Sequence, residues 1–306
     1  MVFEILLAVA EILGMFTVGA IARITGRIND QDIDRWSKLI LDFLLPAFIF
    51  NSIINSFQIE RLNELWPLPL LGLGLVVYGT IGGILLRFGL CSTDKRDHRS
   101  FIHFCAVNNS TYLPIVIVRN IFGETTLANL FFFNFGTIIG IWTIGIAILG
   151  AGNLKTGIRN VLTPNLVSII AAFALVITGT HLFIPPLVNN IIRQTGSAAV
   201  PLMLILIGAT LTSREAFRIS WPVIYISIVR LIILPAVAIF TLSLLPISSE
   251  VYSIAVIVAL MPVAVSSAIT FRRYGGNPGY AASTALVTTI LSILTVPAAL
   301  LILFGK

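Results

Sequence analysis

The sequence AVNNSTYLP at residues 106–114 interrupts an apolar stretch that covers residues 98–122. Four consecutive polar residues are followed by a proline, in the part of the stretch that would lie deep in a membrane. A second interruption, MPVAVSS at residues 261–267, lies in the apolar stretch 250–273. Because proline removes a backbone donor and disfavours helical backbone in the residue before it, we expect both stretches to unwind. Irregular backbone at membrane depth is tolerated only when it is buried in protein or lines a wet cavity.

The composition indicates a membrane protein. Of the 306 residues, 57% are hydrophobic and 10% are charged, and the mean hydropathy is +1.01. So few charged side chains cannot cover a soluble domain of this size, which excludes a soluble enzyme, a nucleic-acid-binding protein and a disordered tail. The two cysteines do not make a disulfide framework, and the opening Met-Val-Phe-Glu lacks a basic leader, so we expect no cleaved signal peptide.

Apolar stretches long enough to cross a bilayer recur along the whole chain. A hydrocarbon core of about 30 Å requires about 20 apolar residues per helix. Ten stretches qualify, and they cover residues 2–24, 36–57, 64–88, 98–122, 124–149, 164–183, 186–212, 219–245, 250–273 and 278–304. They are long and uniformly apolar rather than short and alternating, which excludes a barrel. We therefore predict an all-α polytopic membrane protein with ten transmembrane helices.

The basic residues predict the orientation. The connections that follow odd-numbered spans hold fourteen of the 19 basic residues, and the opposite side holds three, Arg61, Arg119 and Lys306. The fourteen are Arg23, Arg27, Arg35, Lys38, Arg87, Lys95, Arg96, Arg99, Lys155, Arg159, Arg214, Arg218, Arg272 and Arg273. The positive-inside rule then predicts a multi-pass protein of the plasma (cytoplasmic) membrane with both termini on the extracytoplasmic side. The anionic inner lipid surface accounts for the pI of ≈ 9.7.

The spans divide into two repeats of five. Residues 1–150 are predicted to form the first repeat, 151–163 a cytoplasmic connection and 164–306 the second repeat, which the odd number of spans turns upside down. Residues 119–123 align with residues 272–276 at an offset of 153, and Pro46 aligns with Pro201 at an offset of 155. The two interruptions fall in the corresponding spans four and nine. The half-helices after Pro114 and Pro262 would aim their N-termini at each other, and the partial positive charge of these ends favours an anion.

Several of these motifs resemble the auxin efflux carrier family, which includes plant auxin transporters and bacterial permeases for malate or malonate. The motifs are LLPA at 44–47, NSTYLP at 109–114, AVPL at 199–202, LIGATL at 206–211, MPVAV at 261–265, YGGNPGYAAS at 274–283 and LSILTVP at 291–297. The resemblance covers essentially the whole chain. Many members place the asparagine of span four seven residues before the proline, whereas Asn109 precedes Pro114 by five here.

Membership of this family implies the fold of the sodium/bile-acid symporters, with broken, crossing helices in spans four and nine. It also implies a scaffold domain made of spans 1, 2, 6 and 7, a transport domain made of spans 3–5 and 8–10, and a homodimer formed through the scaffold.

The candidate substrate-binding residues lie in or beside the interruptions and at other polar positions inside spans. They are Asn51, Asn108, Asn109, Tyr112, Pro114, Asn134, Arg230, Pro262, Ser266 and Ser267. The amides of Asn108 and Asn109 suit a carboxylate, and their alternative role is to cap the half-helices. Asn51 and Asn134 line the pathway or bond a neighbouring helix. The pairs Gly79/Gly83 and Gly136/Gly140 indicate close helix packing.

Three charged residues inside spans are candidates for ion coupling. Arg230 lies about 16 Å into span eight, where a charge is costly. It is a counter-ion to the substrate, a fixed cation in place of a co-transported sodium ion, or part of an internal salt bridge. Glu11 is a proton-coupling carboxylate or a partner for Arg230. Asp42 follows Lys38 by four residues, which favours a local helix pair.

The remaining sequence patterns limit the classes of function that the chain could have. Cys91, His98, His103 and Cys105 do not have the spacing of a zinc site, and no phosphate-binding loop is present, so we expect no metal, cofactor or ATP. No constellation of catalytic residues indicates an enzyme. The sequence predicts a secondary transporter that moves a small organic anion, a carboxylate, by an elevator-type shift, with H⁺ or Na⁺ left open as a coupling ion. The alternatives are a sodium-coupled symporter of the bile-acid type and an anion-binding membrane receptor.

Overall fold

The computed structural model describes residues 2–150, 162–210 and 219–304, and this part of the chain is helical, with no strand. Six helical segments are long and apolar enough to cross a membrane, namely Asp30–Ser56, Pro67–Leu90, Tyr112–Leu149, Pro186–Thr210, Trp221–Ser243 and Gly279–Phe304. Pro164–Ile177 and Ser249–Ala259 are shorter apolar helices. The structure thus confirms an all-helical membrane protein, while the count of ten crossings stays a prediction.

The α-helices follow the predicted spans closely. They are α1 (Val2–Ile24), α2 (Asp30–Leu39), α3 (Leu45–Ser56), α4 (Leu62–Leu65), α5 (Pro67–Leu86), α6 (Lys95–Ala106), α7 (Tyr112–Gly140), α8 (Ile146–Leu149), α10 (Pro164–Ile177), α11 (Pro186–Ser197), α12 (Ala199–Thr210), α13 (Trp221–Ile228), α14 (Leu234–Ser243), α15 (Ser249–Ala259), α16 (Ser267–Tyr274) and α17 (Pro278–Phe304). Short 3-10 turns cover Ile59–Arg61 (η2), Arg87–Leu90 (η3) and Thr180–Phe183 (η5).

Three π-helical segments join α-helices within a span. They are η1 (Ile40–Leu44), η4 (Ile141–Gly145) and η7 (Val229–Ile233). Pro46 follows η1 and Pro235 follows η7 by two residues each. A proline ring clashes with the carbonyl four residues earlier, and a widened turn relieves that clash. The prolines therefore account for two of the three π segments. No proline follows η4 at that spacing.

Both predicted interruptions are present. The chain leaves helix after Ala106 and resumes it at Tyr112, and it leaves helix again after Ala259 and resumes it at Ser267. The half-helix that follows each interruption ends at a glycine. Gly123 has φ 85° and ψ −178° inside α7, and Gly275, after α16, has φ 104° and ψ 170°. An L-residue rarely adopts this backbone, so glycine is required for the turn into the next span.

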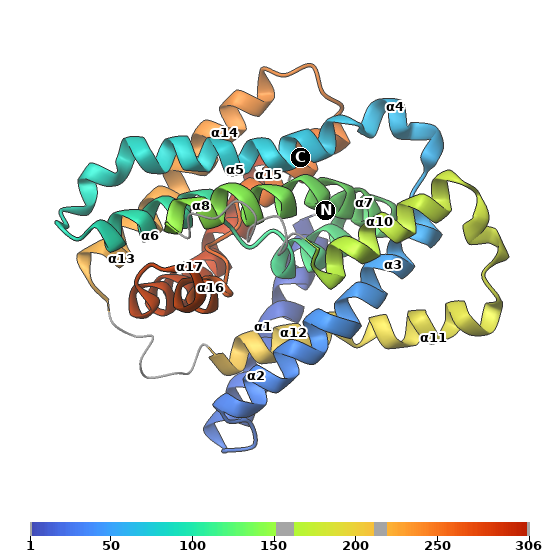
Figure 1. Ribbon diagram of the computed structural model, residues 1–306, viewed down its shortest axis with the longest axis horizontal. Coiled ribbons are helices and arrows are strands. Elements are labelled where there is room, and N and C mark those ends of the chain that lie inside the picture. The colour runs from blue at the N-terminus through green and yellow to red at the C-terminus, as the bar shows by residue number, and fades with distance from the viewer. Residues whose placement is uncertain (1, 151–161, 211–218, 305–306) are drawn as a thin grey trace.

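The helices pack in two groups (Figure 1). In one group α1 packs against α12, and α3 packs against α10 and α11. In the other, α5 packs against α6 and α7, α14 against α15, and α16 against α17. In Figure 1, α10 and α11 lie around α3 on the right, while α13 and α16 lie on the left. The first group consists of the spans that the family resemblance assigns to the scaffold.

Glycines allow α5 to approach its neighbours closely. A Cβ added at Gly79 would overlap the carbonyl oxygen of Cys105 in α6, and one at Gly83 would lie 2.9 Å from the Ile102 Cα. A Cβ at Gly136 in α7 would likewise overlap the Pro69 carbonyl oxygen. Gly79, Gly83 and Gly136 therefore pack against backbone, and Gly140 packs against the side chains of Val76 and Leu73, so the close helix packing predicted for both pairs is confirmed.

Some of the basic residues on which the predicted orientation depends lie outside the described residues. Lys155 and Arg159 of the predicted connection 151–163, and Arg214 and Arg218 of the connection after span seven, fall in the ranges that the structure does not describe.

Candidate functional site

The two interruptions lie against each other. Residues 107–111, between α6 and α7, run antiparallel to residues 260–266, between α15 and α16, with Asn108 paired to Val263. The Asn109 N–H donates to the Pro262 carbonyl oxygen at 2.9 Å. We call these two non-helical segments the paired breaks. Their backbone groups are partly satisfied by each other, which permits irregular backbone inside a helical bundle.

Local sequence explains where each break begins and ends. Pro114 lies in the first turn of α7, where a missing N–H costs nothing because the first N–H groups of a helix have no intrahelical partner. Pro262 lies within the second break and contributes only its carbonyl to the pairing. The break in span four therefore precedes its proline, and the break in span nine contains it.

Asn109 uses its amide oxygen to cap α7. The Tyr112 N–H donates to Asn109 Oδ1 at 3.0 Å. Because an N–H can only donate, the amide oxygen faces the helix and the amide nitrogen faces away. Asn109 is 3% exposed, and its Nδ2 has no hydrogen-bond partner. The capping role predicted for Asn109 is confirmed, and a buried amide donor is left over beside the break.

Asn108 ties the first break to the other half of the chain. Its Nδ2 donates to the Val258 carbonyl oxygen near the end of α15. This bond joins residues 150 positions apart. Asn108 therefore holds the two broken spans together.

Two buried polar side chains support the breaks from outside. Asn134 in α7 donates through Nδ2 to the Ser110 carbonyl oxygen at 3.0 Å, and its Oδ1 has no partner. Thr288 in α17 accepts from the Val263 N–H through Oγ1 at 3.3 Å. Asn134, predicted to line the pathway or to bond a neighbouring helix, bonds the first break rather than a helix. Thr288 was not predicted from the sequence. The repeat could have identified it, because Thr288 follows Asn134 by 154 positions, between the offsets of 153 and 155 that relate the two repeats.

Arg230 lies in η7 behind the paired breaks and is 5% exposed. Its guanidinium donates to three backbone carbonyl oxygens, those of Met261 at 3.0 Å, Cys105 at 3.1 Å and Ala259 at 3.3 Å. The predicted internal salt bridge is wrong within the described part of the chain, where Arg230 forms no ion pair. Burial of the arginine is compensated by carbonyl dipoles.

The other predicted site residues lie at varying distance from this centre. Ser267 begins α16, is 1% exposed and has an unpartnered Oγ, whereas the preceding Ser266 is exposed. Asn51 accepts a 3.1 Å hydrogen bond from Asn55 within α3. Asp42 lies exposed in η1, and no ion pair joins it to Lys38 in the described structure.

Glu11 does not pair with Arg230. It is exposed on α1 and accepts a 2.7 Å hydrogen bond from Nδ2 of Asn120 in α7. The Arg230 partner predicted as one alternative for Glu11 is therefore wrong, because the guanidinium is enclosed by the ends of α6 and α15. The Glu11 bond instead joins the two groups of helices.

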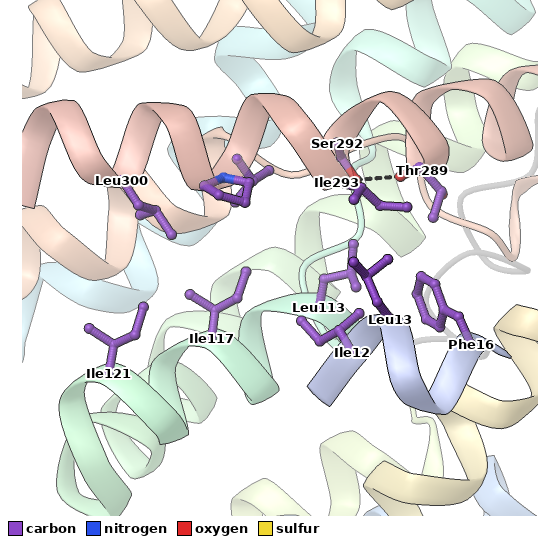
Figure 2. Close-up of a pocket in the computed structure, with 12 residues that line it drawn as sticks. Ile12, Leu13, Phe16, Leu113, Ile117, Ile121, Thr289, Ser292, Ile293 and Leu300 are labelled. Carbon is purple, nitrogen blue, oxygen red and sulfur yellow. Dashed lines mark hydrogen bonds between the residues drawn. The ribbon is translucent and has the colours of Figure 1, made fainter. Parts of the chain in front are cut away.

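A crevice lined by residues of α1, α7 and α17 lies near the paired breaks. Figure 2 shows side chains of α1, α7 and α17 that point toward one another across it. Leu113 lies next to the Asn109-capped N–H of Tyr112, and Thr289 lies next to Thr288. Ser292 donates to the Thr289 carbonyl oxygen at 2.7 Å, while the Thr289 hydroxyl has no partner. The crevice is thus mainly apolar, and two of its lining residues, Leu113 and Thr289, are chain neighbours of Tyr112 and Thr288, which bond the breaks.

The structure does not bring Cys91, His98, His103 and Cys105 together in one site. Cys91 is exposed and Cys105 is buried, and both are free. His103 packs edge-on against Phe271, with 4.9 Å between ring centroids. Among the described residues, no group of three or more His, Cys, Asp or Glu side chains could hold a metal ion.

Comparison with known proteins relates the chain to transporters. The family model described as "Membrane transport protein" matches residues 4–152 and 149–300. An uncharacterized transporter of Methanocaldococcus jannaschii is 24% identical over 292 residues, which cover 93% of this chain and 94% of the relative. An uncharacterized transporter of Methanothermobacter thermautotrophicus is 24% identical over 297 residues, or 94% and 95% of the two chains. A protein of Rhizobium meliloti named "Putative malonate transporter" is 25% identical over 303 residues, or 94% of each chain.

Proposed function

This chain belongs to the membrane transport protein family, the auxin efflux carrier family that its motifs resemble, and we propose that it is a secondary transporter for a small organic anion. The proposed substrate is a carboxylate, which crosses the cytoplasmic membrane by alternating access. The proposal includes ten membrane crossings in two inverted repeats, with both termini outside and a homodimer formed through the scaffold helices.

The paired breaks are the observation that supports this proposal most directly. The second half-helices α7 and α16 begin at Tyr112 and Ser267, beside the breaks, and helix N-termini carry partial positive charge and unpaired N–H groups. Two buried donors without partners lie at the same ends, Asn109 Nδ2 and Ser267 Oγ. Donors at broken-helix N-termini are the recurring way in which transporters hold an anionic group.

The charge distribution also favours an anion. Among the residues whose burial is described, Arg230 is the one buried charged side chain. A buried carboxylate near the breaks would repel an anionic substrate, and the described residues contain none. The described residues near the paired breaks thus include one buried positive charge and no buried negative charge, which supports an anionic substrate.

The crevice suggests how the rest of the substrate is held. Its lining is apolar apart from Thr289 and Ser292 at the end near the breaks. A carboxylate at the N-termini of α7 and α16 would place its carbon chain against Leu113 and Ile117. The name of the Rhizobium relative, a "Putative malonate transporter", is in line with a small carboxylate.

Alternating access would involve the boundary between the two groups of helices. The crevice lies on this boundary, with α1 on one wall and α7 and α17 on the other. We propose that the group that carries the paired breaks shifts as a unit along the other group, in an elevator-type movement. The crevice would then be the outer half of the route.

The test is transport by purified protein in liposomes. A panel of small mono- and dicarboxylates is applied without an imposed sodium or pH gradient, and both current and uptake of labelled substrate are measured. The proposal predicts saturable uptake of at least one carboxylate. Asn109→Asp serves as the test variant for the site and should reduce this uptake, because it retains a capping oxygen and removes the donor. Binding of a carboxylate without any uptake by well-folded protein would instead indicate a receptor.

A further inference from the structure

Arg230 is surrounded by carbonyl oxygens that come from two converging helix ends. Cys105 is the second-last residue of α6, Ala259 is the last residue of α15, and Met261 lies just beyond it. The C-terminal end of a helix carries about half a negative charge on its unpaired carbonyl groups. The guanidinium thus lies where the negative ends of the two first half-helices meet, opposite in polarity to the positive ends at the paired breaks.

Such a set of carbonyls is also a ligand set for a metal cation. Hard cations take backbone carbonyl oxygens, and the C-terminal ends of broken helices are a common place for coupling ions in transporters. Here three carbonyl oxygens lie within 3.0–3.3 Å of guanidinium nitrogens. A covalently attached cation already occupies the position where a soluble cation would bind.

We propose that Arg230 is a built-in cation, which fills a monovalent cation site formed by the ends of α6 and α15. The protein then stabilises its paired breaks without binding Na⁺. Given the proposed transport function, the anion moves without Na⁺ coupling, because the site for the coupling ion is permanently filled.

A narrow polar gap lies beside the guanidinium, lined by Arg230 together with Asn108, Tyr78, Thr137 and apolar side chains. A replacement ion would need the space that the guanidinium itself vacates. Truncation of Arg230 to alanine would join the space of the guanidinium to this gap. The carbonyl oxygens of Cys105, Ala259 and Met261 would then face an open site that contains polar side chains and room for water.

The experiment measures cation-dependent stability of the purified full-length protein without substrate. Melting temperatures of wild type and Arg230→Ala are compared in NaCl, KCl and choline chloride at equal ionic strength. Wild type is expected to melt at the same temperature in all three salts. Arg230→Ala is expected to melt lower in choline and to recover on the order of 5 °C in a saturating concentration of Na⁺ or K⁺, because a ligand that binds only the folded state stabilises it. Methylguanidinium at millimolar concentration should also restore part of the loss.

Two further variants make the result specific. Arg230→Lys retains a cation and should show no response to Na⁺, whereas Arg193→Ala removes an exposed arginine that bonds Asn190 and should behave as wild type. If Arg230→Ala cannot be isolated, Arg230→Gln provides the same comparison with a side chain of similar length. Equal melting of the folded neutral variant in Na⁺ and choline would overturn the proposal, as would Na⁺-dependent melting of wild type. Because no substrate is used, this result is independent of whether the transport assay succeeds.

Discussion

Asn109 shows how one side chain serves both the fold and the proposed site. Its oxygen accepts the Tyr112 N–H, which fixes the start of α7, and this bond turns the amide nitrogen toward the other side. The nitrogen is buried without a partner. A buried donor without a partner costs free energy, and in the proposed transporter the substrate would meet this donor.

Substitution of Asn109 separates the two roles. Asn109→Asp keeps an oxygen for the cap and should melt close to wild type, but its apparent affinity for a carboxylate should fall about 10- to 100-fold, because a hydrogen bond to a charged group is replaced by repulsion. Asn109→Ala should lose about 1 kcal/mol of stability with the cap, in addition to affinity. Thermal melting and uptake kinetics measure the two effects. Unchanged affinity in a stable Asn109→Asp protein would limit Asn109 to capping.

Thr288 provides a second test at the scale of a residue. The Thr288→Val side chain has nearly the same shape but cannot accept the Val263 N–H, which is fully buried. We expect a loss of roughly 1–3 kcal/mol, the cost of leaving a buried donor unpaired. Thr241→Val is the control, because Thr241 is exposed and bonds only to carbonyls of its own helix. Equal melting temperatures of the two variants would show that Thr288 does not support the second break.

For single residues, the sequence predicted which side chains are buried better than it predicted their hydrogen-bond partners. The burial of Arg230 could be predicted from its place in the middle of an apolar span. Its carbonyl partners could not, because they become available only where α6 and α15 end, 125 and about 30 positions away along the chain. The salt bridge was expected because a buried charge usually pairs with a charge, and the converging helix ends replaced it here.

The helices themselves could be predicted from the sequence to a large degree, since hydropathy and proline positions marked the spans and both breaks. The π segment η4 had no comparable signal, because it does not precede a proline. The Tyr112 N–H at the start of α7 is bonded by Asn109, and the sequence predicted capping for Asn108 and Asn109 alike without deciding between them.

Because α5 approaches α6 closely, a single methyl group added at Gly79 should lower the stability of the protein. Gly79→Ala should destabilise the protein by roughly 1–3 kcal/mol, because the new Cβ would overlap the Cys105 carbonyl oxygen and force the two helices apart. The same carbonyl accepts a hydrogen bond from Arg230, so the displacement would also reach the breaks. Gly74→Ala, on the exposed side of α5 with no atom within 4 Å of the added Cβ, should be neutral or stabilising. Melting curves of both variants decide the matter, and a stable Gly79→Ala would argue against tight packing.

At the scale of the whole molecule, the arrangement has opposite polarity on the two sides of the paired breaks. Negative ends of α6 and α15 meet at Arg230, and the positive end of α7 lies beside the crevice at Leu113. In the proposed transporter, a fixed cation behind the breaks and free donors in front of them would give an anionic substrate one favourable side from which to approach. This polarity follows from antiparallel pairing of two broken spans, which the sequence predicted through the repeat and the resemblance rather than through any single residue.

The crevice predicts a gradient of accessibility along α7. Single cysteines at Ile121, Ile117 and Leu113, introduced into a Cys91→Ser background that removes the exposed native thiol, should react with a membrane-impermeant thiol reagent in that order when it is applied from outside. The reason is that Leu113 lies nearest the paired breaks and Ile121 lies farthest from them along the same helix. A transported carboxylate should slow the reaction at Leu113 most.

Leu294→Cys is the matched control for this gradient. Leu294 is 74% exposed on α17 but does not line the crevice, so it should face lipid and react slowly with a reagent confined to water. Labelling that followed exposed area, with Leu294→Cys the fastest, would mean that the crevice is closed to water. Labelling of the α7 cysteines from the inside only would reverse the predicted orientation while leaving the crevice as the route, because its walls would be the same and only its open side would change.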